Sequence, residues 1–287
     1  MSRIAYVNGR YTPHSEACVH VEDRGYQFSD GVYEVCEIRD GHLIDETRHL
    51  VRLERSLDEL RIARPMTRAA LKCVLREVLR RNRVRDGIVY LQVTRGVSRR
   101  DHIFPPTHVT PAVVVTARSL DPSRSSKAAE QGISVITLPD NRWDRVDIKA
   151  VSLLPNVLAK QAAKEAGAKE AWFVDADGYV TEGASTNAWI VTPDGELVTR
   201  PAEQGILRGV TRTTLIDVLE KKGLRFVERP FTVEEAKKAR EAFITAATQI
   251  TMPVVRIDDT MVADGKPGPV TQALRAVFHD VAERLPI

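Results

Sequence analysis

The hydrophobic period changes twice in the first half of the chain, and this restricts the folds that it can adopt. Residues 3–44 consist of short alternating runs separated by turn residues, which predicts antiparallel strands. From Asp45, an expected N-cap, two amphipathic helical patterns follow, and Pro65 separates them. Strands return at 88–95 and 112–118. Helices and strands are grouped rather than alternating, which predicts an α+β fold with two helices covering one face of a sheet.

A polar stretch divides the chain near its middle. Residues 119–131, SLDPSRSSKAAEQ, show no apolar period and are expected to form a linker. The 287 residues are also too many for one comfortable core. We therefore expect an N-terminal domain at 1–118 and a C-terminal domain at 132–287.

The second half has elements of its own. We expect a strand at 133–138, helices at about 155–166, 209–222 and 268–284, and two hairpins that turn on Asp-Gly in EAWFVDADGYV and NAWIVTPDGELV. The sequence TVEE predicts a capping box with Thr232 as N-cap and Glu235 at N3.

Composition excludes several classes of function. The net charge of +3 comes from 42 basic and 39 acidic residues that are mixed along the chain, so a nucleic-acid partner is not expected. Cys18, Cys36 and Cys73 lack metal-ligand spacing, and we expect reduced thiols and no metal. The sequence shows no signal core and no apolar run of about 18 residues, which predicts a cytoplasmic protein without membrane contact.

Lys149 is the first candidate for chemistry, because it stands in the otherwise apolar run VDIKAVSLLPNVLAK. A buried ammonium must find a partner or give up its proton. Two interpretations are open. The side chain extends to solvent from the edge of a strand, or it is a nucleophilic amine that forms a Schiff base with a substrate carbonyl or with pyridoxal phosphate.

Pyridoxal phosphate would need a phosphate site and an acid facing the ring nitrogen. In GILRGVTR, Gly209 permits close approach, and Val210 and Thr211 offer N–H groups at an expected helix N-terminus. In TEGAST, Glu182 ends a hairpin strand and is able to hold a pyridinium proton. An ordinary capped helix and a solvated glutamate are the alternatives.

The loop after residue 95 carries a further pair. In SRRDHIF, Arg100 and His102 would point to the same side of an extended segment and together hold an anionic group. A basic surface loop is the alternative.

Seven motifs join these fragments: GYQFSDGVYEV, HLVRL, QVTRGVSRRDH, DIKAVSLLPNVLAK, TEGASTN, GILRGVTR and ITAATQI. In order and separation they resemble the class IV (fold-type IV) pyridoxal-phosphate aminotransferases, and most closely the D-amino acid (D-alanine) aminotransferases, from about residue 3 to about residue 280. The resemblance implies a two-domain fold, with a small N-terminal α/β domain and a larger C-terminal β-barrel-like domain with helices.

The resemblance also assigns roles to individual residues. It implies that Lys149 forms the Schiff base with pyridoxal 5′-phosphate and moves a proton at the substrate Cα, and that Glu182 pairs with the pyridinium nitrogen. The other cofactor contacts that it implies are Arg52, the backbone of Val210 and Thr211 and the hydroxyl of Thr248 at the phosphate, and Leu207 against the ring.

Substrate binding is implied in the same way. Tyr33, Arg100 and His102 match the family's trap for the α-carboxylate, in which the arginine and histidine come from the other subunit of a homodimer, at the subunit interface. The position of this trap relative to the lysine selects the D-enantiomer. The expected reaction is a reversible ping-pong transamination from a D-amino acid to a 2-oxo acid, either pyruvate or 2-oxoglutarate.

Rival functions and departures from the family pattern stay open. The rivals are an L-branched-chain or (R)-amine transaminase, aminodeoxychorismate lyase, and a cofactor-binding carrier without turnover. Ser29 and Ala184 replace a common glycine and a common serine, and Ala246-Ala247 replaces more hydroxylated residues. Glu37 stands where a basic residue is frequent, on the same strand face as Tyr33, and is expected to alter side-chain preference or to weaken carboxylate binding.

Overall fold

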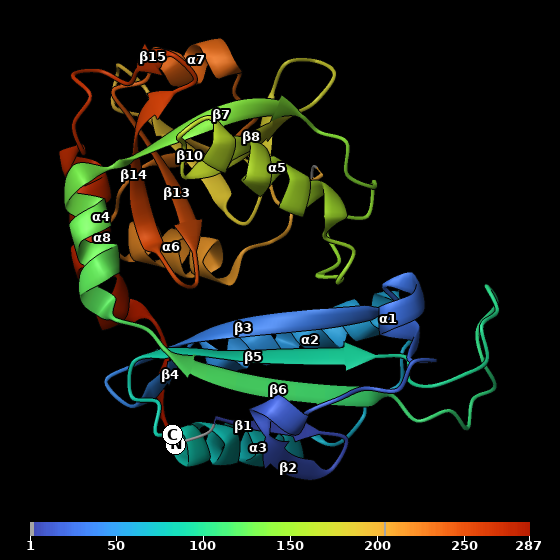
Figure 1. Ribbon diagram of the computed structural model, residues 1–287. Helices are drawn as coiled ribbons and strands as arrows, with labels where there is room; N and C mark the ends of the chain where they lie inside the picture. The colour runs from blue at the N-terminus through green and yellow to red at the C-terminus, as the bar shows by residue number, and fades with distance from the viewer. Residues whose placement is uncertain (1–2, 204) are drawn as a thin grey trace. The chain divides into compact units, whose positions relative to one another are not determined.

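The computed structural model describes residues 3–203 and 205–287, which form two compact units (Figure 1). Unit 1 consists of Met1–Pro122, Ile148–Ser152 and Glu283–Ile287, and unit 2 consists of Ser123–Asp147 and Leu153–Ala282.

The described residues of unit 1 contain one antiparallel sheet of seven strands. In spatial order these are β16 (Arg284–Pro286), β4 (His42–Ile44), β3 (Gly31–Arg39), β5 (Gly87–Thr94), β6 (Ala112–Ser119), β1 (Ile4–Val7) and β2 (Arg10–Pro13). Asp40 and Gly41 connect β3 to β4 with φ angles of 49° and 74°, which suit a tight hairpin turn. The antiparallel strands predicted in this half are confirmed.

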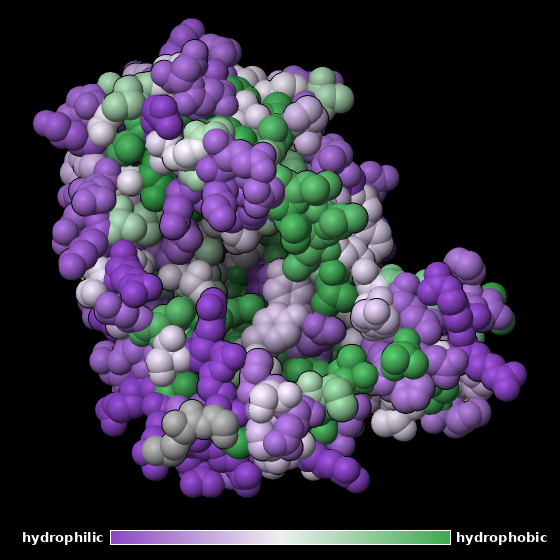
Figure 2. Space-filling view, viewed as in Figure 1, coloured by the Kyte–Doolittle hydropathy of each residue, from purple (hydrophilic) through white to green (hydrophobic). Residues whose placement is uncertain are grey.

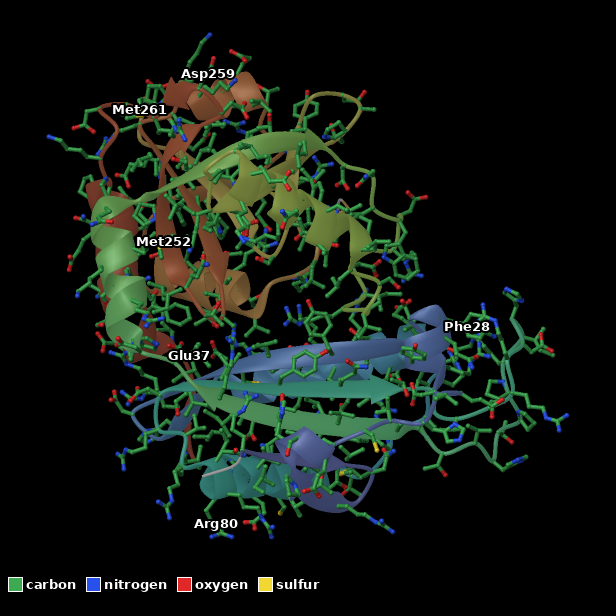
Figure 3. The ribbon with its side chains drawn as sticks, in the orientation of Figure 1. Phe28, Glu37, Arg80, Met252, Asp259 and Met261 are labelled. Carbon is green, nitrogen blue, oxygen red and sulfur yellow. The ribbon has the colours of Figure 1, made fainter. Side chains whose placement is uncertain are left out.

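Two helices, α2 (Glu46–Glu59) and α3 (Arg68–Asn82), cover one face of this sheet. Their apolar residues share a core with the even-numbered side chains of β3 from Val32 to Ile38, whereas Tyr33 and Glu37 lie on the opposite face. Figure 3 labels Glu37 on β3. The predicted covering of one face is confirmed.

Two short helices were not predicted from the sequence pattern, namely η1 (His14–Glu16) and α1 (Arg24–Phe28). The Asp23 side chain caps α1 by accepting from the N–H of Gly25 at 2.8 Å, and Ser29 ends it with a φ of 58°. The left-handed conformation at Ser29 explains why glycine suits this position. A helix of five residues is too short to show a helical period.

The described residues of unit 2 contain one mixed sheet of nine strands, which Figure 1 shows as curled. Its order is β12 (Phe226–Glu228), β11 (Leu197–Thr199), β10 (Asn187–Val191), β13 (Glu241–Ala246), β14 (Ile250–Ile257), β7 (Ile133–Pro139), β8 (Glu170–Val174) and β9 (Val180–Gly183), with β15 (Thr260–Met261) beside β14. The remaining helices are α4 (Pro122–Gln131), α5 (Leu154–Glu165), α6 (Val210–Lys221), α7 (Val233–Lys237) and α8 (Pro269–Val281).

Local signals in this half are confirmed. The two Asp-Gly hairpins connect β8 to β9 and β10 to β11, and Gly178 and Gly195 take φ angles of 84° and 88°. The Thr232 hydroxyl accepts from the N–H of Glu235 at 3.1 Å, which is the N-cap half of the predicted capping box, and the Glu235 carboxylate accepts from Arg229. The fold class is α+β with a barrel-like larger sheet, as expected.

The linker expected at 119–131 is largely helical. Strand β6 reaches Ser119, and α4 begins at Pro122, a residue that suits the first helical position. Ala129 is the buried residue of α4 and packs on the core of unit 2. A single buried side chain leaves no period that a sequence pattern could show.

The range 132–287 also differs from the units observed. Ile148–Ser152 belongs to unit 1, because Ala150 forms a bridge with Val32. The helix expected to reach residue 284 ends at Val281, and the residues after it form β16, which pairs with β4. Both contacts join residues distant in sequence, so local periodicity does not reveal them.

An apolar stripe is exposed on α5. Leu154, Val157 and Leu158 are 68%, 58% and 58% exposed, and Figure 2 shows a green patch over this helix. Their spacing places them on one helix face. Exposed apolar groups that cluster in this way are typical of a protein contact surface.

Within the described ranges, every helix is too short or too polar to cross a bilayer.

Candidate active site

The main chain around Lys149 is fixed beside β3 in unit 1. Ala150 bridges Val32, the N–H of Tyr33 donates to the carbonyl of Lys149 at 3.0 Å, and the N–H of Lys149 donates to Ser56 Oγ at 3.3 Å. These hydrogen bonds attach the lysine to a sheet, which positions a reactive side chain more accurately than a free loop does.

The side chain of Lys149 lies over an aromatic ring. Its Nζ is 4.2 Å from the centre of the Tyr33 ring, which stacks on Tyr90 with 5.7 Å between ring centres. The Tyr90 hydroxyl donates to Gln92 Oε1 at 2.7 Å. Burial, with a smaller effect of Tyr33, raises the pKa of Tyr90 to about 12, so this phenol keeps its proton at neutral pH. The structure thus brings together Lys149 and Tyr33.

Arg52 on α2 forms a bidentate ion pair with Glu34 of β3. The Nε and Nη2 atoms of Arg52 donate to the two carboxylate oxygens at 2.7 and 2.8 Å, and His49 Nδ1 lies 2.7 Å from Oε2. Burial alone would raise the pKa of Glu34, but the charge and hydrogen bonds of Arg52 and His49 lower it to about 2. The predicted phosphate ligand is therefore oriented by a buried anion.

Arg100 and His102 meet on one aromatic side chain. The guanidinium of Arg100 lies 4.5 Å from the centre of the Phe28 ring, and the His102 ring lies 5.4 Å from it. Arg24 also covers this ring at 4.8 Å and donates to the carbonyl of Asp101 at 2.6 Å. Figure 3 labels Phe28 at the end of α1. Arg100 and His102, two of the three predicted carboxylate ligands, are exposed and lie against the same ring.

Glu182 ends β9 in unit 2, where both of its oxygens accept hydrogen bonds. Asn187 Nδ2 donates to Oε2 at 3.0 Å, and the N–H of Leu207 lies 3.2 Å from each oxygen. Arg142 Nη1 donates to Oε1. The side chain of Glu182 is 7% exposed, so these donors satisfy the hydrogen-bonding capacity of a buried carboxyl group.

The N-terminus of α6 lies near the same residues. Gly209 is the N-cap, and within the described chain no side chain caps this helix. A Cβ at Gly209 would lie 2.0 Å from Asn187 Oδ1, so any larger residue would displace the Asn187 side chain. Val210 and Thr211, in the first turn, are buried, and Thr248 lies in the turn between β13 and β14. These backbone groups are suited to an anion.

Several supporting residues were not singled out from the sequence. They are Glu34, Arg142, Asn187 and Phe28. The partners of Glu34, Asn187 and Arg142 are 18, 5 and 40 residues away, and the patterns around these side chains resemble ordinary polar positions. Among the described residues, no cluster of three or more His, Cys, Asp or Glu side chains is able to hold a metal ion.

Comparisons with known proteins agree with this geometry. The family model for amino-transferase class IV matches residues 31–257. The chain is 40% identical over 278 residues to a D-alanine aminotransferase of Staphylococcus haemolyticus, covering 97% of each, and 41% identical over 273 residues to one of Bacillus licheniformis, covering 95% of each. A branched-chain amino acid aminotransferase of T.th., solved with pyridoxamine 5′-phosphate, has a TM-score of 0.89 at 25% identity, over 98% of this chain and 94% of that one. With a family match across both units and relatives alike over nearly their whole length, this chain belongs to the class IV aminotransferases.

Proposed function

We propose that this chain is a D-amino acid aminotransferase that uses pyridoxal 5′-phosphate to move an amino group from a D-amino acid to a 2-oxo acid. The observation that carries the proposal is the likeness to two relatives named D-alanine aminotransferase, which extends over at least 95% of the chain. The structural relative that holds pyridoxamine 5′-phosphate supports the choice of cofactor.

The residues present fit this cofactor. The anionic Glu182 receives donors on both oxygens and is suited to pair with a protonated ring nitrogen. The start of α6 after Gly209 suits a phosphate, because its first N–H groups point outward and the helix dipole favours an anion there. Arg52 supplies a guanidinium that Glu34 holds in place.

Each residue then has a role in the reaction. Lys149 attaches the cofactor through Nζ and, once free, moves a proton at the substrate Cα. Bound pyridoxal phosphate supplies an electron sink for the pair left when the Cα–H bond breaks. The remaining ligands are Glu182 at the ring nitrogen, Leu207 against the ring, and Arg52, the N–H groups of Val210 and Thr211 and the hydroxyl of Thr248 at the phosphate.

The substrate carboxylate is assigned to Tyr33, Arg100 and His102. We propose that the arginine and histidine act on the partner subunit's site in a homodimer. The exposed apolar stripe of α5 and Ile103, which is 72% exposed beside His102, support such an interface. The anchored carboxylate fixes which enantiomer presents its Cα hydrogen to the lysine, and this gives selectivity for D-amino acids.

A donor panel tests the proposal. Protein loaded with pyridoxal phosphate is incubated with D-alanine, L-leucine or an (R)-amine, with 2-oxoglutarate as acceptor, and the keto product is measured. We expect turnover with D-alanine to exceed turnover with L-leucine by a large factor. A preference for L-leucine or for the amine would contradict the assignment to D-amino acids.

The lysine is tested with a matched pair of variants. Lys149→Ala is expected to lose both the visible absorbance of lysine-bound cofactor and all transamination, because the attachment point and the proton carrier are removed together. Lys164→Ala, in the last turn of α5, is expected to keep both properties. Full activity of Lys149→Ala would overturn the central assignment.

A further inference from the structure

Arg142 connects two acids in unit 2. Its Nε and Nη2 atoms donate to the two oxygens of Asp140 at 2.9 and 2.7 Å, and its Nη1 donates to Glu182. The guanidinium also lies 4.6 Å from the centre of the Phe173 ring. The side chain of Arg142 is 5% exposed, so its charge is placed within the site rather than in solvent.

Hydrogen bonds also join Asp140 and Arg142 to Thr181. Thr181 Oγ1 donates to Asp140 Oδ2 at 2.8 Å and lies 3.4 Å from Arg142 Nη2. Burial alone would raise the pKa of Asp140, but the hydrogen bonds and charge of Arg142 outweigh it and the pKa is lowered. Asp140 is therefore an anion at neutral pH and is paired with the Arg142 cation.

We propose that Arg142 is a positioning residue that keeps the Glu182 carboxylate anionic and so keeps the shared proton on the pyridine nitrogen of the bound cofactor. This inference rests on the proposed function, because it needs pyridoxal phosphate paired with Glu182. Arg142 contacts Glu182 directly, so we assign it to act through that acid.

The effect of Arg142 depends on its relative distances from the carboxylate and from the ring nitrogen. Arg142 is in hydrogen-bond contact with Glu182, whereas a ring nitrogen paired with the other side of that carboxylate is farther from the guanidinium. Coulomb attraction falls with distance, so the cation stabilises the carboxylate anion more than it destabilises the pyridinium. Removing Arg142 therefore favours transfer of the proton from nitrogen to Glu182.

A second cation, Arg212, interacts electrostatically with Glu182. The charges of Arg212, on α6, and of Glu182 act on each other, but Arg212 pairs with Glu228. Arg142, by contrast, donates directly to the Glu182 carboxylate.

Asp140 separates this electrostatic role from a merely structural one. Asp140 offsets part of the arginine's charge, so Asp140→Asn leaves Arg142 acting more strongly on Glu182. If Arg142 has only a structural role, both variants should have the same effect on Glu182, because Asp140→Asn and Arg142→Met break the same ion pair. The two variants should therefore differ in where the proton lies only if charge is what matters.

The experiment measures the nitrogen-15 chemical shift of labelled pyridoxal phosphate bound to each variant, with its dissociation constant from fluorescence titration. We expect a pyridinium shift in the wild type, Arg142→Lys and Asp140→Asn. In Arg142→Met the shift should move toward neutral pyridine, with binding weakened about tenfold or more, since hydrogen bonds to charged groups are strong. Arg145→Met, at a half-exposed arginine paired with Asp147, is the matched control and should match the wild type.

Each outcome decides the matter. A pyridinium shift retained in Arg142→Met, or a neutral pyridine in Asp140→Asn, would overturn the inference. If Arg142→Met does not fold, Asp140→Asn still separates the two roles, because the electrostatic role predicts that this variant keeps the pyridinium and the structural role predicts that it loses it. A wild type that binds the cofactor with a neutral nitrogen overturns the inference alone, and one that binds no cofactor overturns the proposed function with it.

Discussion

Glu34 and Arg52 are joined by two parallel hydrogen bonds of 2.7 and 2.8 Å between β3 and α2. The side chains are 2% and 12% exposed, so the pair is removed from most solvent screening. Burial alone would lower the pKa of Arg52, but the charge of Glu34 raises it. A buried pair of this kind is costly to break, because the remaining charge stays buried without its partner.

We predict that Glu34→Gln lowers the free energy of unfolding near neutral pH by about 3–5 kcal/mol, the range for a broken buried pair. Unfolding by urea measures this change. Glu77→Gln is the contrasting control. Glu77 also has a pKa of about 2, from hydrogen bonds with Arg80 and Arg81, but it lies at the surface, where ion pairs contribute little. Equal losses in both variants would contradict the role of burial.

The stability from Glu34 depends on pH in a defined direction. Its pKa is about 2 when folded and 4.5 ordinarily, so the folded state holds the proton less tightly than the unfolded state. The contribution is complete above about pH 4.5 and is lost as the pH falls through about 2, with a total of about 3 kcal/mol. We therefore expect the stability difference between wild type and Glu34→Gln to shrink between these two values. A constant difference would show that the carboxylate charge is not responsible.

Local features of the fold follow from the sequence because a few neighbouring residues determine them. The leucines of α2, the turn at Asp40-Gly41 and the Thr232 cap each depend on spacing within a few residues. Helix α4 was not predicted from the sequence, because Ala129 is its only buried residue and one residue shows no period. The pairing of Ala150 with Val32 did not follow either, because strand pairing over such a separation depends on the whole fold.

The site was predicted unevenly for a related reason. Motifs pointed to Lys149 and Glu182, whose chemistry requires particular residue types in particular contexts. They did not point to Arg142 or Glu34, which act by holding another side chain. From the sequence, several charged residues in the same segment are equally suited to that role. Only the three-dimensional contacts identify which residue holds the other side chain.

Gly209 provides a test of the phosphate site. Its φ of −62° suits alanine, so the cost of Gly209→Ala comes from the 2.0 Å approach of the new Cβ to Asn187 Oδ1. Asn187 donates to Glu182 and to the carbonyl of Leu207, both at 3.0 Å, and its displacement would disturb both contacts. We expect the dissociation constant of pyridoxal phosphate to rise at least about tenfold, measured by fluorescence titration.

A double-mutant cycle identifies the cause of that loss. In an Asn187→Ala background the clash is absent, so Gly209→Ala should weaken cofactor binding much less than it does in the wild type. The same loss in both backgrounds would assign the effect to the helix start rather than to Asn187.

Arg100 is expected to bind the carboxylate and not the reacting carbon. Arg100→Ala should therefore raise the KM for D-alanine by about tenfold or more, and should affect D-alaninamide, which lacks the carboxylate, far less. Arg99→Ala removes an exposed neighbour of the same charge and should leave both KM values nearly unchanged. Equal effects of Arg100→Ala on the two donors would exclude Arg100 from carboxylate binding.

Subunit mixing tests whether Arg100 acts across a dimer interface. Lys149→Ala and Arg100→Ala are each expected to be impaired alone, but a hybrid dimer contains one subunit with its own Lys149 and a partner that supplies Arg100. Random pairing in equal amounts makes about half of the dimers hybrid, each with one complete site, so at D-alanine concentrations well below the wild-type KM co-expression should restore about a quarter of wild-type activity. If Arg100 serves its own subunit, every site lacks one of the two residues. Activity that stays at the level of the separate variants, in a sample shown by sedimentation to be dimeric, would place Arg100 in its own subunit's site.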